Sequence, residues 1–91
     1  MAHIFKVLNQ VKTDKEMMYY LVKQSMNRKI KVVSRSNNKN MLQSLIDILL
    51  HCNYAVPTEN DNTFLSNTSP SSYRLLNANE FIELATEYDI A

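Results

Sequence analysis

The sequence predicts a small α+β domain in which about three helices pack on a small sheet. Three observations support this: an apolar segment with helical periodicity from Met41 to Cys52, alternation from Lys29 to Ser36, and two capping-box spacings that begin at Thr13 and Asn77. The 91 residues fit one domain, 1–91, that has enough core to fold alone. The predicted order of elements is β-α-β-α-β-β-α.

The first two predicted elements are a strand and a helix. Residues 3–11 fit a helical spacing as well as a strand, and their β-branched and aromatic content favours the strand. The capping box from Thr13 to Glu16 predicts a helix that continues to about Arg28. Its predicted buried face consists of Met17, Met18, Leu21, Val22, Ser25 and Met26. The centre of its predicted outer face consists of Lys15, Tyr19 and Lys23.

The next predicted element is a strand from Lys29 to Ser36. Period-two alternation would place Ile30, Val32 and Ser34 on one face. The same alternation would place Lys31, Val33 and Arg35 on the other face. The segment Ser36-Asn37-Asn38 then has the composition of a turn and of a helix N-cap.

The segment from Met41 to Cys52 is predicted to be the core helix. Its apolar residues cover more than half of the helix circumference, which is more than a helix lying on one surface needs. We therefore expect this helix to be packed on two sides, with Cys52 behaving as a small hydrophobic residue. Because the chain has no glycine, positions with positive φ are expected at asparagine, and Asn27 and Asn53 each follow a predicted helix.

The last third of the chain predicts a hairpin and a helix. Residues 63–66 and 73–76 would form two strands, joined by the polar segment 67–72. The capping-box spacing of Asn77 and Glu80 predicts a helix from about Ala78 to Tyr88. The side chains expected to dock this helix on the core are Phe81, Ile82, Leu84, Ala85 and Tyr88.

The composition excludes several function classes. Without glycine, neither a P-loop nor a dinucleotide fingerprint can be built, so no nucleotide cofactor is expected. His3 and His51 have no ligand cluster around them, so no metal site is expected either. The single cysteine cannot form an internal disulfide. No apolar run approaches the ~20 residues that span a bilayer, and no signal peptide is recognisable, so we expect a cytoplasmic protein without a membrane partner. The bias towards residues with A/T-rich codons indicates an AT-rich genome, such as that of a phage or virus.

A catalytic function is not predicted. Asp47 and His51 are spaced i,i+4, which would let the carboxylate orient the imidazole, but the same spacing is an ordinary helix pair. The sequence indicates neither a nucleophile nor an oxyanion site to accompany them. We expect a protein that is not an enzyme.

The charge distribution is uneven along the chain. Residues 1–45 contain nine Lys or Arg and two acids, a balance of +7, whereas residues 46–91 contain one Arg and seven acids, a balance of −6. The basic residues without an intervening acid are Lys23, Arg28, Lys29, Lys31, Arg35 and Lys39. Together with Lys15 and with the ring of Tyr19, on which a base could stack, they form a candidate surface for nucleic acid or for a protein partner.

The predicted last helix has an acidic stripe, which consists of Glu80, Glu83 and Glu87. Three interpretations remain open. The stripe is a solvated face, or it pairs with the basic region within the monomer or across a two-fold homodimer, or it docks on a basic surface of another protein.

The functional prediction is a small non-enzymatic regulatory or inhibitory protein. It would act by binding another macromolecule through charged surfaces, with a protein favoured as the partner. The alternative is binding of RNA or single-stranded nucleic acid by the basic residues from Lys23 to Lys39.

Overall fold

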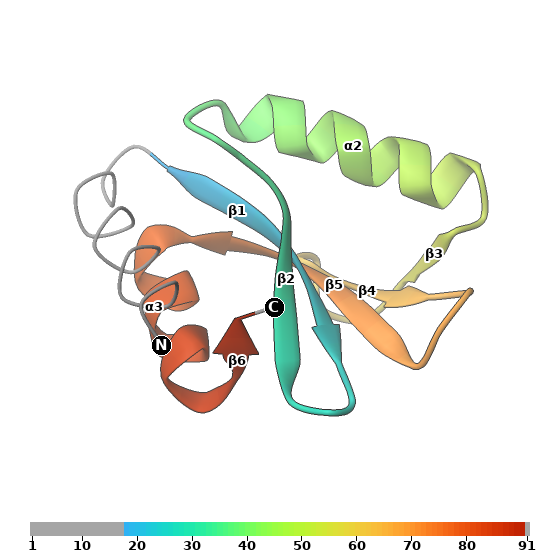
Figure 1. Ribbon diagram of the computed structural model, residues 1–91. Helices are drawn as coiled ribbons and strands as arrows, with labels where there is room; N and C mark the ends of the chain where they lie inside the picture. The colour runs from blue at the N-terminus through green and yellow to red at the C-terminus, as the bar shows by residue number, and fades with distance from the viewer. Residues whose placement is uncertain (1–17, 91) are drawn as a thin grey trace.

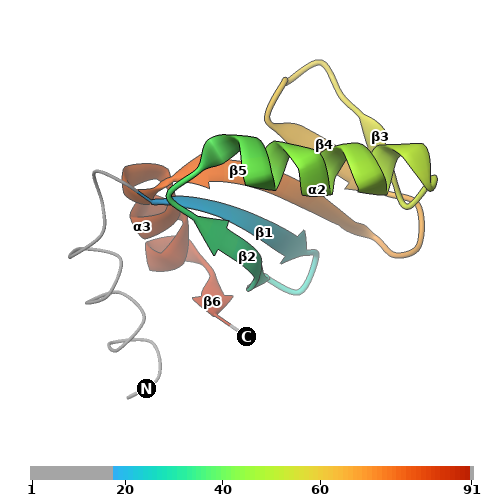
Figure 2. The same ribbon diagram turned by 90° about the horizontal axis from the view of Figure 1, so that it is seen from above.

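A six-stranded mixed sheet carries one helix on each face in the computed structural model, which describes residues 18–90 (Figure 1). The strands are β1 (Tyr19–Ser25), β2 (Lys29–Ser36), β3 (Ala55–Pro57), β4 (Thr63–Ser66), β5 (Ser71–Asn77) and β6 (Asp89–Ile90). The helices are α2 (Lys39–His51) and α3 (Ala78–Glu87). The spatial order is β3-β4-β5-β1-β2-β6, and the view from above places α2 in front of the sheet and α3 behind it (Figure 2). The predicted α+β class is confirmed in this form, with two helices among residues 18–90.

The segment from Tyr19 to Ser25 is a central strand, so the prediction of a helix that continues to about Arg28 is wrong. Tyr20, Leu21 and Val22 are all at most 1% exposed, because helices cover both faces of the sheet at β1. A strand buried on both faces is a continuous apolar run and lacks the alternation that identifies a half-buried strand. The capping box at Thr13, the possible strand at residues 3–11 and Lys15 lie outside the described residues.

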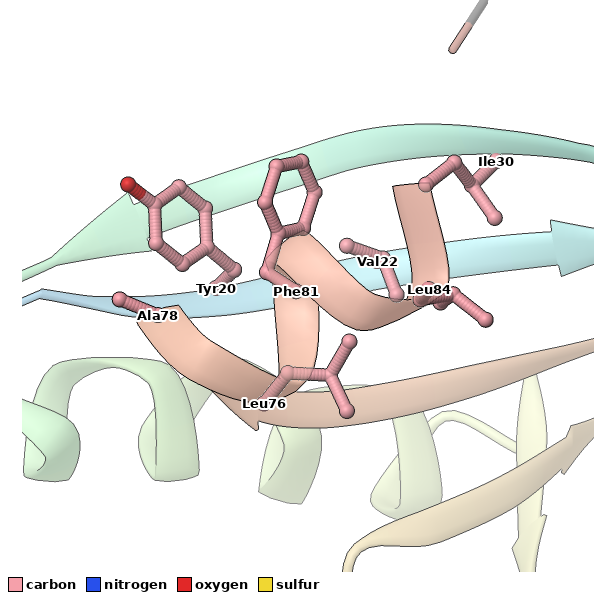
Figure 3. Packing of buried hydrophobic residues seen from close by; sticks show 7 residues of the cluster. All are labelled: Tyr20, Val22, Ile30, Leu76, Ala78, Phe81 and Leu84. Atoms are coloured by element: carbon pink, nitrogen blue, oxygen red, sulfur yellow. The ribbon is translucent and has the colours of Figure 1, made fainter. Parts of the chain in front are cut away.

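One core cluster lies between the sheet and α3 (Figure 3). Its buried members are Tyr20, Val22, Ile30, Leu76, Ala78, Phe81 and Leu84. Ile82, Ala85 and Tyr88 are partly buried against it, which confirms the residues predicted to dock the last helix. The capping box of Asn77 and Glu80 is present: the Asn77 side chain accepts from the Glu80 amide at 2.8 Å, and the Glu80 carboxylate accepts from the Asn77 amide at 3.0 Å.

The second core cluster lies between the sheet and α2. Its buried members are Leu21, Leu42, Ile46, Ala55, Phe64, Tyr73 and Leu75. Helix α2 contributes only Leu42 and Ile46 as buried residues, so the prediction that this helix is packed on two sides is wrong. Leu49 and Leu50 are partly buried against this cluster, whereas Met41, Leu45 and Ile48 are exposed. The expectation of a buried Cys52 is wrong too, because Cys52 is exposed.

A bulge in β2 changes which face its side chains occupy. Val22 pairs with Val32 and Leu21 pairs with Ser34, so Val33 is an extra residue between the two pairs. The predicted alternation holds from Lys29 to Val32 and then reverses. Arg35 lies opposite Tyr20 and therefore shares the α3 face, whereas Ser34 shares the α2 face with Leu21.

The hairpin of β4 and β5 is confirmed, with Thr63 opposite Arg74. Strands β3 and β6 were not predicted, because three and two residues are too few to show a periodicity. Strand β6 runs parallel to β2 and pairs with it only at Lys29 and Ile30.

Two residues have positive φ within the described part of the chain, Asn53 and Arg28, both at 62°. Asn53 follows α2, as predicted for a chain without glycine. The expectation for Asn27 is wrong, because no helix ends there and the turn between β1 and β2 places Arg28 in the left-handed region instead.

Candidate functional site

Three of the basic residues predicted as a binding surface lie together on the α2 face of the sheet. Lys23 and Lys31 are direct cross-strand partners, and Lys29 lies two residues before Lys31 on the same strand. They line a hollow of about 460 Å³ at the end of the sheet where Ser25 of β1 pairs with Ser71 of β5. Figure 1 shows the β1–β2 turn at this end of the sheet. We call this hollow the lysine hollow; its lining consists of Lys23, Ser25, Met26, Asn27, Lys29, Lys31, Ser69, Pro70 and Ser71.

The three lysines give the lysine hollow an excess of positive charge. The lining contains no Asp or Glu, and within residues 18–90 none of the three ammonium groups is in an ion pair. The Lys23 ammonium lies 5.6 Å from the centroid of the Tyr73 ring, the residue opposite it on β5. A cation–π contact of this kind holds the side chain over the ring without neutralising its charge.

The other predicted basic residues lie elsewhere. The Arg28 guanidinium lies 5.1 Å from the Tyr88 ring and donates to the Glu87 main-chain carbonyl at 3.0 Å, so it joins the β1–β2 turn to the end of α3. Arg35 lies on the α3 face because of the bulge. Lys39 lies at the start of α2, with its ammonium 5.8 Å from the centroid of the Tyr19 ring.

Tyr19 is less open to a stacking base than its predicted position on a helix surface implied. The ring is half-buried against the α2 cluster, and the Lys39 ammonium lies over it. Tyr19 and Lys23 share one face of β1, as they would have shared one face of the predicted helix. Residues four positions apart lie on the same side of a strand and on the same side of a helix.

The predicted acidic stripe lies on the opposite side of the sheet from the lysine hollow. Glu80, Glu83 and Glu87 are exposed on α3, and together with Arg74 and Leu84 they line a shallow hollow of about 190 Å³. The Glu80 carboxylate is engaged in the capping box, so it has a structural role in starting α3. Because α2 and α3 cover different faces, the stripe and the three lysines do not meet within one molecule.

The outer face of α2 is the main feature that sequence reasoning assigned wrongly. Met41, Leu45 and Ile48 are 59%, 37% and 57% exposed, and Cys52 is exposed as well. Their spacing of four, three and four residues places them along one stripe, as in the apolar seam of a coiled coil. We call these four residues the α2 seam. The width of the apolar arc revealed the stripe, but it does not tell whether the second contact is made within the chain or with another molecule.

A second hollow, of about 590 Å³, lies beside the lysine hollow and shares Ser25, Met26 and residues 69–71 with it. Its other walls include Arg28, Leu65 and Tyr88. Leu65 is 51% exposed and pairs with Val56 on the neighbouring strand, which is 37% exposed. This site could not be predicted from the sequence, because it depends on the pairing of the end of β1 with the start of β5 and of β5 with the end of β4.

The predicted helix pair of Asp47 and His51 is on the exposed side of α2. The Asp47 carboxylate accepts from the Gln43 side chain at 3.4 Å, and in the described part of the chain no hydrogen bond joins Asp47 to His51. Among these same residues, no group of three His, Cys, Asp or Glu side chains could hold a metal ion. Neither of the described helices is long and apolar enough to cross a bilayer.

Comparison of the chain with models of protein families, with curated proteins and with solved structures finds no match.

Proposed function

We propose that this chain is a small non-enzymatic regulatory protein that docks on another protein through the α2 seam. The observation that carries the proposal is the exposure of Met41, Leu45 and Ile48 in one stripe, next to the side of α2 where Leu42 and Ile46 are buried. Contiguous exposed apolar surface is uncommon on small monomeric proteins and is typical of interaction sites.

The neighbours of the seam indicate the chemistry of the partner. Leu42 and Leu49 border it on the side of the sheet, and Ser44 and His51 border it on the side of solvent. Because no Lys, Arg, Asp or Glu stands at these flanking positions, a strongly charged surface would gain little here. The partner that fits is an amphipathic helix whose own apolar stripe packs along α2.

This proposal shifts the main contact from charged surfaces, which the sequence favoured, to an apolar one. Buried apolar anchors supply most of the binding energy at protein interfaces, whereas exposed ion pairs contribute about 0–1 kcal/mol each. The acidic residues of α3 and the basic residues near α2 are then assigned to steering and to partner choice.

The experiment uses Cys52, the only cysteine, as the position for a photo-crosslinker on the seam. A partner crosslinked in the native host would be identified, purified and titrated with the wild type and with two variants. Leu45→Glu places a charge in the seam and should weaken binding by about 30-fold or more, the loss expected at an interface hot spot. Gln43→Glu adds the same charge on the polar face of α2 and should change affinity by less than about twofold.

Equal affinity of the wild type and Leu45→Glu would contradict the proposal. Sedimentation of the purified protein supplies the homodimer test. A dimer that Leu45→Glu dissociates and Gln43→Glu leaves intact would identify a second copy of this chain as the partner helix.

The alternative function, binding of RNA or single strands, is supported by Lys23, Lys29 and Lys31, which lie together in a hollow whose described lining contains no Asp or Glu. For a strand held by these three lysines alone, log Kd should change with log salt concentration with a slope of about 2, since each phosphate on a single strand contributes about 0.7. A slope near 4, as expected if all six basic residues from Lys23 to Lys39 engaged phosphates, would argue for a wider surface.

A further inference from the structure

We propose that the lysine hollow is a binding site for the phosphate group of a compact ligand. The hollow measures about 460 Å³. Small-molecule sites typically measure about 300–1,000 Å³. No residue of α2 lines it, so this site is separate from the α2 seam, and the inference does not depend on the function proposed above.

Two positive charges lie side by side in the lysine hollow. Lys23 and Lys31 are direct cross-strand partners on adjacent strands, an arrangement in which like charges destabilise a sheet. Lys29 adds a third positive charge on the same face. A bound anion would remove this repulsion and would gain from all three ammonium groups at once.

The described lining of the hollow contains no Asp or Glu that would compete with an anion for the lysines. Asp89 lies opposite Lys29 in the β2–β6 pair, but its carboxylate forms no ion pair with a lysine of the hollow within residues 18–90. The glutamates of α3 lie on the other face of the sheet. An anion that entered the hollow would meet the three ammonium groups and the neutral donors of the lining, with the Asp89 position beside Lys29 at the β2–β6 edge.

The lining of the hollow also contains neutral residues that can donate hydrogen bonds. The Ser69 and Ser71 hydroxyls lie 2.6 Å apart, with Pro70 between them, and the Ser71 amide donates to the Ser69 carbonyl at 2.8 Å. Both serines and Asn27 line the hollow. The mutual hydrogen bond of the two serines uses one hydroxyl proton, so the neutral donors of the lining are the other hydroxyl and the Asn27 side-chain amide. Phosphate oxygens only accept hydrogen bonds, so ammonium, hydroxyl and amide donors together suit them.

The aromatic surroundings of the lysines favour a compact ligand over a long strand. Binding of a long single strand relies on exposed aromatic rings that stack successive bases. Within residues 18–90, the ring in contact with one of these lysines is that of Tyr73, which is 8% exposed and has Lys23 over it. The site would recognise the phosphate itself, either in a free oligophosphate or at the phosphorylated end of a strand.

The test titrates the full chain with sodium tripolyphosphate at constant ionic strength and follows the backbone amides by two-dimensional NMR. Saturable shifts should centre on residues 25–31 and 69–71, with a Kd of about 1 mM or lower. The double variant Lys23→Gln with Lys31→Gln should weaken binding at least tenfold, which corresponds to about 1.4 kcal/mol, since it removes two charge-assisted hydrogen-bond donors. Lys39→Gln removes one charge from the start of α2; it is the matched control for the single variant Lys29→Gln and should change Kd by less than about twofold.

A second arm separates the two sources of phosphate. A short single-stranded oligonucleotide is titrated with and without a 5′ phosphate. Tighter binding of the phosphorylated form supports the site and assigns it to strand ends. Tighter binding of tripolyphosphate supports the site and assigns it to free oligophosphates. Shifts spread evenly over the surface lysines, no saturation, or an unchanged Kd in the double variant would overturn the proposal. The double variant is expected to fold, because removal of the repulsion between Lys23 and Lys31 should raise its melting temperature. The single variant Lys29→Gln, at an exposed position, tests the loss of phosphate binding independently.

Discussion

The Tyr20 ring stacks on the Phe81 ring, with the two centroids 4.5 Å apart and an angle of 14° between the ring planes. Tyr20 belongs to the central strand and Phe81 to the helix that follows the last long strand, so this contact joins segments about sixty residues apart in sequence. Figure 3 shows the two rings side by side at the centre of the cluster. This contact fixes the position of α3 on the sheet.

The Phe81→Ala substitution should lower the free energy of unfolding by about 3–5 kcal/mol, because Phe81 is 0% exposed and its loss leaves a cavity beside Tyr20. Urea denaturation followed by circular dichroism measures the change. Ile82→Ala, on the adjacent and only partly buried position, should cost much less. Similar costs for the two variants would show that α3 does not pack in this orientation.

A pair of leucines on α2 tests the orientation of that helix. Leu42 is 1% exposed and Leu45 is 37% exposed, so Leu42→Ala should destabilise the protein by about 2–5 kcal/mol and Leu45→Ala by less than about 1 kcal/mol. Thermal and urea unfolding of the purified monomer measure both. Equal losses would return α2 to the two-sided packing that the sequence predicted.

The left-handed conformation of Asn53 predicts a third outcome. Asn53→Gly should leave the stability unchanged or raise it slightly, whereas Asn53→Val should lower it by about 1–2 kcal/mol, because a β-branched side chain opposes positive φ. Melting temperatures of the two variants give the comparison. Asn27→Gly serves as the control and should bring no gain, since Asn27 is not among the described residues with positive φ.

Most of the fold could be predicted where one face of an element is buried and the other is exposed. The β2 strand and α3 each show a periodicity that matches their burial, and the β4–β5 hairpin is indicated by the polar segment between its strands. The β1 strand does not, because Leu21 and Val22 are buried on opposite faces and their run fits a helix as well as a strand. The extent of α2 was also predictable, but its burial was not, since an apolar arc does not reveal which molecule covers it.

The candidate sites were predicted in part for similar reasons. The sequence indicated Lys23, Lys29 and Lys31 as basic residues of one region, but their meeting with Ser69 and Ser71 depends on the pairing of β1 with β5. The departure of Arg35 from this surface depends on the single extra residue at Val33, which no propensity scale locates.

The bulge at Val33 has a further consequence for the open edge of the sheet. Strand β6 covers β2 only at Lys29 and Ile30, and beyond them, among residues 18–90, the outer edge of β2 has no strand beside it. Because the bulge reverses the alternation, Lys31 and Arg35 project from opposite faces of this edge. A strand of another molecule that aligned with β2 would meet an irregular hydrogen-bonding ladder and a cation on each side. Charge and irregular backbone thus protect this edge from intermolecular β-aggregation, which a covering element does in many other sheets.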